Sequence, residues 1–118
     1  MFSHWEELEK LSPVQNGRWD KDRLYEYLVQ SCCMTFQEEL NRFFHQYEQD
    51  RQLAGLLLDF LLDEDYDGSD SQMGAAFYLS RMDRAVLREE KDRLLLAQAN
   101  EVDWKRPFSN ACQLSWLE

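Results

Sequence analysis

Apolar residues recur along the chain at the spacing of amphipathic helices. The clearest stripe has apolar or aromatic side chains at i, i+4, i+7, i+8 and i+11, which places them on one helical face. Its members are Phe36, Leu40, Phe43, Phe44 and Tyr47. Two further stripes have a helical period; they comprise Leu24, Tyr27, Leu28 and Cys32, and Leu53, Leu56, Leu57, Phe60 and Leu61. The last stripe is out of phase with the first, so we predict a separate helix over residues 51–62.

Polar residues mark where these helices should begin. Ser3 and Thr35 are each followed three residues later by glutamate, the spacing of a capping box that satisfies backbone N–H groups of the first turn. Asp20 is a further N-cap candidate. The helix behind Ser3 should end before Pro13, and residues 13–19, which include an Asn-Gly pair, are expected to form a turn.

The segment from Ser71 to about residue 100 is compatible with two helical arrangements. Ser71 is a candidate cap, and apolar positions behind it continue at helical spacing; they are Ala75, Leu79, Met82 and Val86. One helix could run unbroken through this segment. Alternatively, the chain could be recapped at Ser80, with Asp83 completing a capping box. Residues 88–93 are highly charged and predict a solvated stretch.

The C-terminal tail shows no clear period from residue 101 onward. Its large apolar residues are Val102, Trp104, Phe108 and Trp116. Pro107 breaks any helix there, and Ser109 could cap a last short one. The final pair, Leu117 and Glu118, is also compatible with a vector-derived scar, so no expectation rests on it.

Composition supports an all-α fold. The chain has 4 Gly and 2 Pro, lacks Ile, and contains little Val or Thr, although strands favour β-branched residues. Hydrophobic residues make up 44% and aromatic residues 14%, which excludes a disordered chain. A length of 118 residues suits one domain with one core. We therefore predict a compact single-domain bundle of about five to seven helices over residues 1–118.

Cysteine usage and the N-terminus indicate a cytoplasmic protein. The three cysteines, Cys32, Cys33 and Cys112, are an odd number and do not suggest a disulfide framework. The first residues show neither the basic region nor the apolar region of a signal peptide. The apolar runs are far too short to cross a bilayer. We expect reduced thiols and no membrane partner.

The formal net charge of −10 is concentrated in one part of the chain. The segment from Gln52 to Ser80 holds six of the 23 acids and none of the 13 Lys and Arg residues. Such a cluster is often an interaction surface that steers a basic partner. Tyr66, in its midst, is an aromatic residue of the kind that anchors interfaces. The residues expected to bind a partner are Asp59, Asp63, Glu64, Asp65, Tyr66, Asp67 and Asp70.

The strongest local motif lies in this cluster and resembles an EF-hand calcium loop. Asp63, Asp65, Asp67 and Gly68 match its positions 1, 3, 5 and 6. Position 12, which should supply a bidentate glutamate, is Gly74. Because the closing ligand is missing, a solvated acidic loop between two helices is the favoured interpretation. We predict no metal site and no cofactor.

The sequence carries no residue set typical of catalysis. His4 and His45 lack a second histidine at ligand spacing, and Cys32-Cys33 is not a Cys-x-x-Cys motif. The four glycines are scattered and form no phosphate-binding loop. Basic residues between 81 and 93 alternate with acids, as on a solvated helical face, and the net charge opposes nucleic acid binding. We predict that the protein is not an enzyme and does not bind nucleic acid.

A small, acidic, helical chain of this kind resembles bacterial toxin-immunity proteins, in particular those of contact-dependent growth inhibition systems. The resemblance rests on the acid cluster at 59–70, the helical stripes around it and the aromatic segment 102–108. It implies that the protein binds and blocks a cognate toxin, the C-terminal domain of a delivered effector, often a nuclease with a basic cleft. Acidic side chains would then stand in for substrate phosphates or pair with the Lys and Arg residues of the cleft.

A secretion chaperone or small adaptor is the competing interpretation. Such a protein would hold its client in an exposed apolar groove, and Trp104, Phe108 and Trp116 would then matter more than the acids. Its complex would resist high salt, whereas a complex formed through the acid cluster would weaken as salt screens the charges.

Overall fold

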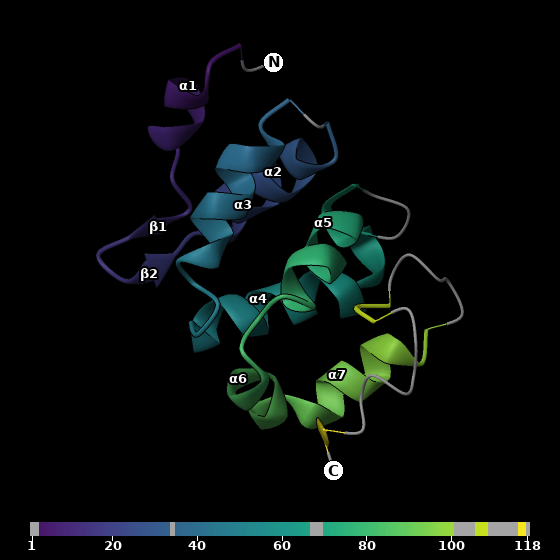
Figure 1. Ribbon diagram of the computed structural model, residues 1–118. Coiled ribbons are helices and arrows are strands. Elements are labelled where there is room, and N and C mark those ends of the chain that lie inside the picture. The colour runs from purple at the N-terminus through teal and green to yellow at the C-terminus, as the bar shows by residue number, and fades with distance from the viewer. Residues whose placement is uncertain (1–2, 34, 67–69, 101–105, 109–115, 118) are drawn as a thin grey trace.

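The computed structural model describes residues 3–33, 35–66, 70–100, 106–108 and 116–117. Within these residues the structure is helical, with a single short hairpin, which confirms the all-α class (Figure 1). The elements in chain order are α1 Trp5–Glu9, β1 Val14–Gln15, β2 Arg18–Trp19, α2 Lys21–Ser31, α3 Gln37–His45, α4 Arg51–Leu62, the 3₁₀ turn η1 Glu64–Tyr66, α5 Asp70–Leu79, α6 Arg84–Glu89 and α7 Lys91–Gln98.

The predicted turn at 13–19 is a small β-hairpin. Val14 pairs with Trp19 and Gln15 with Arg18 in antiparallel register. Asn16 and Gly17 connect the strands with φ values of 54° and 77°, the left-handed conformations that a tight type I′ hairpin turn requires. Periodicity gave no signal for the strands, because each is only two residues long.

α4 forms the centre of the core and has the predicted bounds. Its buried residues form one broad face of the helix, with exposed or half-buried residues on the other side; the buried residues are Leu53, Ala54, Leu57, Leu58, Phe60 and Leu61. α5, α6 and α7 pack against it, and Figure 1 shows α6 and α7 at the end of the molecule opposite the N-terminus. The side chain of Asp50 caps α4 through the Leu53 amide at 3.0 Å and accepts a 3.0 Å hydrogen bond from the Trp19 indole.

The predicted cap at Asp20 is present, whereas the predicted capping boxes at Ser3 and Thr35 are not. Asp20 caps α2 by accepting a hydrogen bond from the Arg23 amide at 3.1 Å. The boxes at Ser3 and Thr35 do not form, because α1 begins after His4 and α3 begins after Phe36, neither of which caps with its side chain. Aromatic rings pack together next to these two helix starts: the Trp5 and Phe36 rings lie 6.1 Å apart.

The two arrangements left open for residues 71–100 are resolved in favour of separate helices. α5 already begins at Asp70, so Ser71 is a buried residue of its first turn and not its cap. α5 ends at Leu79, and the hydroxyl of the next residue, Ser80, donates to the Phe77 carbonyl at 2.7 Å. Asp83 caps α6 by accepting from the Ala85 amide at 2.8 Å, so the new cap is Asp83 itself and not Ser80.

The described parts of the tail are docked on α6 and α7. The backbone of Phe108 makes two hydrogen bonds with the Gln98 side chain, and its ring lies 6.0 Å from that of Trp116. The guanidinium groups of Arg84 and Arg88 lie over the Trp116 ring. Leu117, the residue compatible with a scar, is buried in the core. The tail residues Val102, Trp104 and Ser109 lie outside the described residues.

Two buried tyrosines predict an alkaline loss of stability. The Tyr27 hydroxyl donates to the Leu8 carbonyl at 2.6 Å, and burial raises the pKa of Tyr27 and of Tyr78 to about 12. Since an unfolded tyrosine titrates near pH 10, the folded state holds these protons more tightly. The stabilisation is therefore complete below about pH 10 and is lost as the pH rises toward 12.

Urea unfolding across this range checks the prediction. The urea concentration at the unfolding midpoint should decrease as the pH is raised from about 9 to about 11.5. This decrease should follow the rise in tyrosinate absorbance. Tyr78→Phe should reduce the fall. An unchanged midpoint across this range, or the same fall in the variant, would contradict the assignment.

Candidate interaction surface

The predicted partner-binding acids meet at the turn that joins α4 to α5. Asp63 follows α4 as its C-cap, Asp65 lies in η1, and Asp70 begins α5. We call these three carboxylates the acidic turn. Asp65 and Asp70 are exposed and Asp63 is half-buried. Of the other predicted residues, Glu64 lies in η1 with no description of its side chain, and Asp67 lies outside the described residues.

Hydrogen bonds hold the backbone of the acidic turn. The Asp63 side chain accepts from the Asp65 amide at 2.9 Å, and the Asp63 carbonyl accepts from the Tyr66 amide at 3.1 Å. The fully buried side chain of Gln72 reaches back from α5 and donates to the carbonyls of Phe60 at 2.9 Å and Asp63 at 3.3 Å. These bonds satisfy carbonyl groups at the C-terminal end of α4, which has no further helical turn to do so. These bonds brace the backbone around Asp63 against α5.

Aromatic packing anchors the same turn from the inside. The half-buried ring of Tyr66 lies 4.9 Å from Phe60 and 5.7 Å from Tyr25 between ring centroids. The Lys21 ammonium lies 5.6 Å from the Tyr66 ring centroid, within the range of a cation–π contact. Tyr66 therefore has an internal packing role in addition to the interface role expected of it. Only part of its surface is left for a partner.

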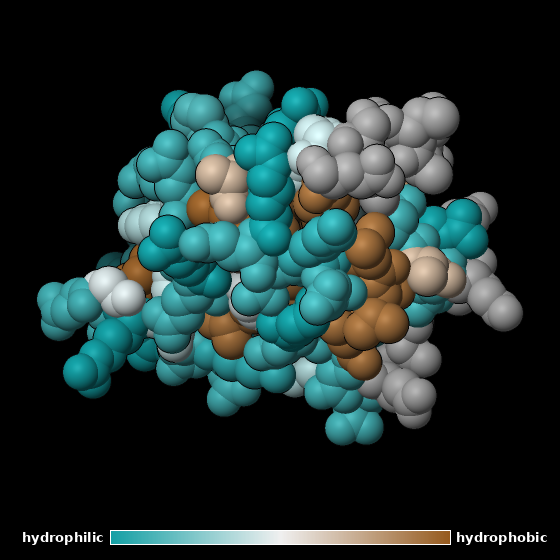
Figure 2. Space-filling view, turned by 90° about the horizontal axis from the view of Figure 1, so that it is seen from below, coloured by the Kyte–Doolittle hydropathy of each residue, from teal (hydrophilic) through white to brown (hydrophobic). Residues whose placement is uncertain are grey.

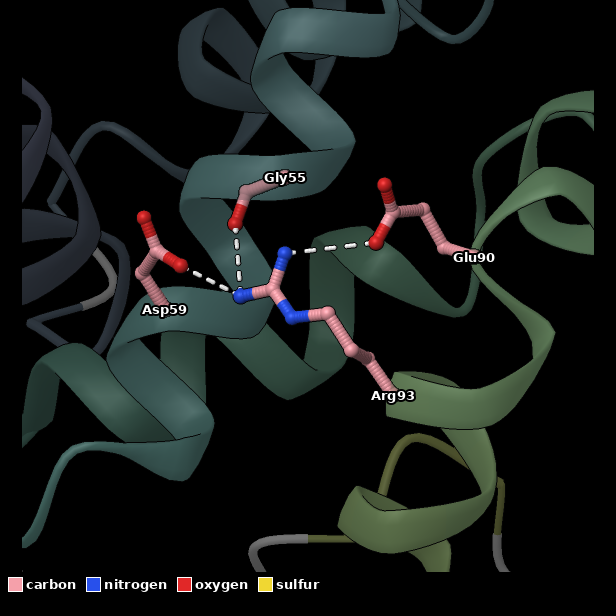
Figure 3. Close-up of polar contacts among 4 residues, drawn as sticks. All are labelled: Gly55, Asp59, Glu90 and Arg93. Carbon is pink, nitrogen blue, oxygen red and sulfur yellow. Dashed lines mark hydrogen bonds and ion pairs between the residues drawn. The ribbon is translucent and has the colours of Figure 1, made fainter.

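Asp59 has a partner within the molecule. Its carboxylate forms an ion pair with Arg93 of α7, whose guanidinium also contacts Glu90 at 3.2 Å and the Gly55 carbonyl at 3.3 Å (Figure 3). Arg93 thereby ties α7 to α4. Because Arg93 is shared between Asp59 and Glu90, it offsets part of their combined charge, and Asp59 contributes less to the surface potential than a count of acids along the sequence suggests.

The acids of the turn have no such compensation. Across the part of the chain that the structure describes, Asp63, Asp65 and Asp70 form no ion pair with Lys, Arg or His. Lys21 is the nearby cation, and it lies over the rings of Phe60 and Tyr66. The acidic turn consequently keeps a net negative potential, the property that attracts a cationic partner surface.

Three contributors to this surface were missed by sequence reasoning. Tertiary contacts bring three side chains to the acids: Lys21, Gln72 and Arg93. Two of them, Lys21 and Arg93, lie outside the segment Gln52–Ser80, which contains no Lys or Arg. No local pattern marks them. The buried polar residue Gln72 offered the only indirect signal, because a glutamine within an apolar helix needs hydrogen-bond partners.

The EF-hand-like part of the turn gives no metal site in the described residues. No group of three His, Cys, Asp or Glu side chains among them could hold a metal ion. Asp67 and Gly68 of the motif lie outside the described residues.

No helix within the described ranges is long and apolar enough to cross a membrane.

A second surface, on α7, is apolar. Leu95 is 41% exposed and Leu96 is 63% exposed, although Leu94 and Ala97 of the same helix are buried. Figure 2 looks onto the side of the molecule formed by α6 and α7 and shows apolar side chains gathered there. Phe108 and Trp116, expected to be exposed in the chaperone interpretation, are instead half-buried against the core.

Comparison of the chain with protein-family models, curated protein sequences and solved structures found no match.

Proposed function

We propose that this protein is a cytoplasmic, non-catalytic binding protein that neutralises a basic protein toxin. Its acidic turn would cover the basic cleft of the toxin, as the resemblance to contact-dependent growth inhibition immunity proteins implies. The observation that carries the proposal is the pairing pattern: Asp59 forms an ion pair with Arg93, whereas Asp63, Asp65 and Asp70 remain without an ion pair in the described structure. Acids without an ion-pair partner are suited to bind Lys and Arg.

The chaperone or adaptor function is the second candidate, and the observation that favours it is the apolar surface on α7. Leu95 and Leu96 would supply the contact, in place of the tail aromatics. An apolar pair of this size is small compared with the patches that mark many interaction sites. The acidic turn, with its anchored backbone, therefore remains the stronger basis for a proposal.

Affinity capture from a lysate of the source organism, at low and high salt, tests the function. We expect a basic protein as the main prey, released by high salt because the Debye length shortens from about 10 Å at 0.1 M to about 3 Å at 1 M. The prey expressed alone should be toxic, and co-expression with this protein should restore growth. A prey retained at high salt, or toxicity unaffected by co-expression, would refute neutralisation through the acidic turn.

A further inference from the structure

A hollow of about 280 Å³ lies between α3 and the C-terminal end of α5. Its apolar lining includes Phe44 and Tyr78, both 3% exposed, and the fully buried Leu53. The rings of Phe44 and Tyr78 are stacked, with centroids 4.0 Å apart and an interplanar angle of 25°. Little of these side chains is exposed, so the floor of the hollow is apolar but small.

The rim of this hollow is basic, although the protein carries a net charge of −10. Arg42, His45 and Arg81 all line it, and all three are exposed. Glu48, the acid of the lining, lies 3.1 Å from the His45 Nδ1. Arg42 and Arg81 have no ion-pair partner in the described part of the chain, and the Arg81 guanidinium lies 4.2 Å from the Phe77 ring centroid. Two uncompensated guanidinium groups therefore flank one apolar hollow.

Apart from the Glu48 carboxylate, which faces His45, several polar groups of the lining can act as donors. The Tyr78 hydroxyl donates to the Asn41 Oδ1 at 2.9 Å, which directs the Asn41 carbonyl oxygen to the tyrosine and leaves its amide nitrogen to donate. Burial raises the pKa of Tyr78 to about 12, so the hydroxyl keeps its proton near neutral pH. Asn41 also lines the hollow. Its amide and the two arginines are all hydrogen-bond donors.

We propose that this hollow binds a small aromatic carboxylate, with its ring over the apolar floor of the hollow and its carboxylate between Arg42 and Arg81. Arginine matches the geometry of a carboxylate with paired, charge-assisted hydrogen bonds. A volume of about 280 Å³ suits a ligand at the lower end of the usual range for small-molecule sites. The ligand is opposite in charge to the basic partner of the acidic turn, so this site is independent of the proposed function.

Phenylacetate, indole-3-acetate and 4-hydroxybenzoate are the probes for this site, each compared with its primary amide. Titrations of the full chain, followed by ¹⁵N–¹H NMR, should show saturable shifts for at least one carboxylate, centred on α3 and the end of α5. The matching amide should bind about tenfold more weakly, because it cannot form charge-assisted hydrogen bonds.

Arginine variants complete the test. Arg42→Gln and Arg81→Gln should each weaken binding of the carboxylate about tenfold or more, whereas Arg18→Gln, a change at an exposed arginine of β2, should not. Unchanged amide spectra away from the substituted sites verify that each variant is folded. Equal affinity for acid and amide, equal effects of all three substitutions, or no saturable binding of any of the three carboxylates would overturn the proposal.

Discussion

Replacing Gly74 with alanine is expected to destabilise the protein by about 1–1.5 kcal/mol, the difference between an overpacking cost of about 2 kcal/mol and the helix-propensity gain of alanine. A Cβ at Gly74 would lie 2.6 Å from the Leu28 carbonyl oxygen and 2.7 Å from the Ser31 Oγ. The Leu28 carbonyl is backbone, so α2 and α5 would have to move apart. This cost exceeds the gain of about 0.5–1 kcal/mol that alanine brings to a helix interior.

Gly55 provides the matched control, because it is also an interior residue of a helix in the core. A Cβ there would meet only the Arg93 Nη1, at 4.0 Å, an ordinary contact distance. Gly55→Ala should therefore stabilise the protein by about 0.5–1 kcal/mol. Urea unfolding followed by circular dichroism measures both variants. Equal shifts in the same direction would show that helix propensity, and not the close approach of α2 and α5, governs position 74.

Neutralising the acidic turn is expected to slow association with the basic partner by about tenfold or more at low salt. The variant carries Asp63→Asn, Asp65→Asn and Asp70→Asn. Asparagine keeps a side-chain oxygen, so residue 63 can still accept from the amide of residue 65, as Asp63 does at 2.9 Å. The fold should therefore survive while the attractive potential is lost.

The control for this experiment has the same change in net charge at other exposed acids. Glu6 and Glu7 on α1 and Asp92 on α7 are exposed, and none of them has an ion pair in the described structure. Their replacement by Gln, Gln and Asn should leave the association rate within about twofold of the original, because steering depends on where the charge lies. Surface plasmon resonance at several salt concentrations gives both rates. Equal slowing by the two triple variants would show that overall charge, and not the acidic turn, drives association.

The Gly74 variant tests the fold, whereas the acid variants test partner binding. Gly74→Ala tests the packing that sets α5 against α2, and α5 carries both Asp70 and the Gln72 side chain that braces the acidic turn. The acid variants leave that packing intact. If the acid variants bind normally while variants at Leu95 and Leu96 do not, the apolar surface of α7 becomes the contact and the chaperone function is favoured.

The sequence by itself determined the helical class and several element bounds, because these depend on interactions between residues a few positions apart. The stripe that begins at Leu53 predicted α4 with its observed bounds, and Asp20 caps α2 as expected. The acidic loop between α4 and α5 was also predictable, since Asp63, Asp65 and Asp70 are local neighbours that cannot all be buried.

Only the tertiary structure decided where α1 and α3 begin and which acids have an ion-pair partner. Ser3 and Thr35 have the spacing of caps, yet α1 and α3 begin where the Trp5 and Phe36 rings pack. Asp59 looked like a surface acid because Arg93, its partner, is 34 residues further along the chain. Gly74 looked like a missing calcium ligand, and its small size is instead required where α5 crosses α2. Contacts between distant segments leave no periodic trace in the sequence, so packing alone assigns them.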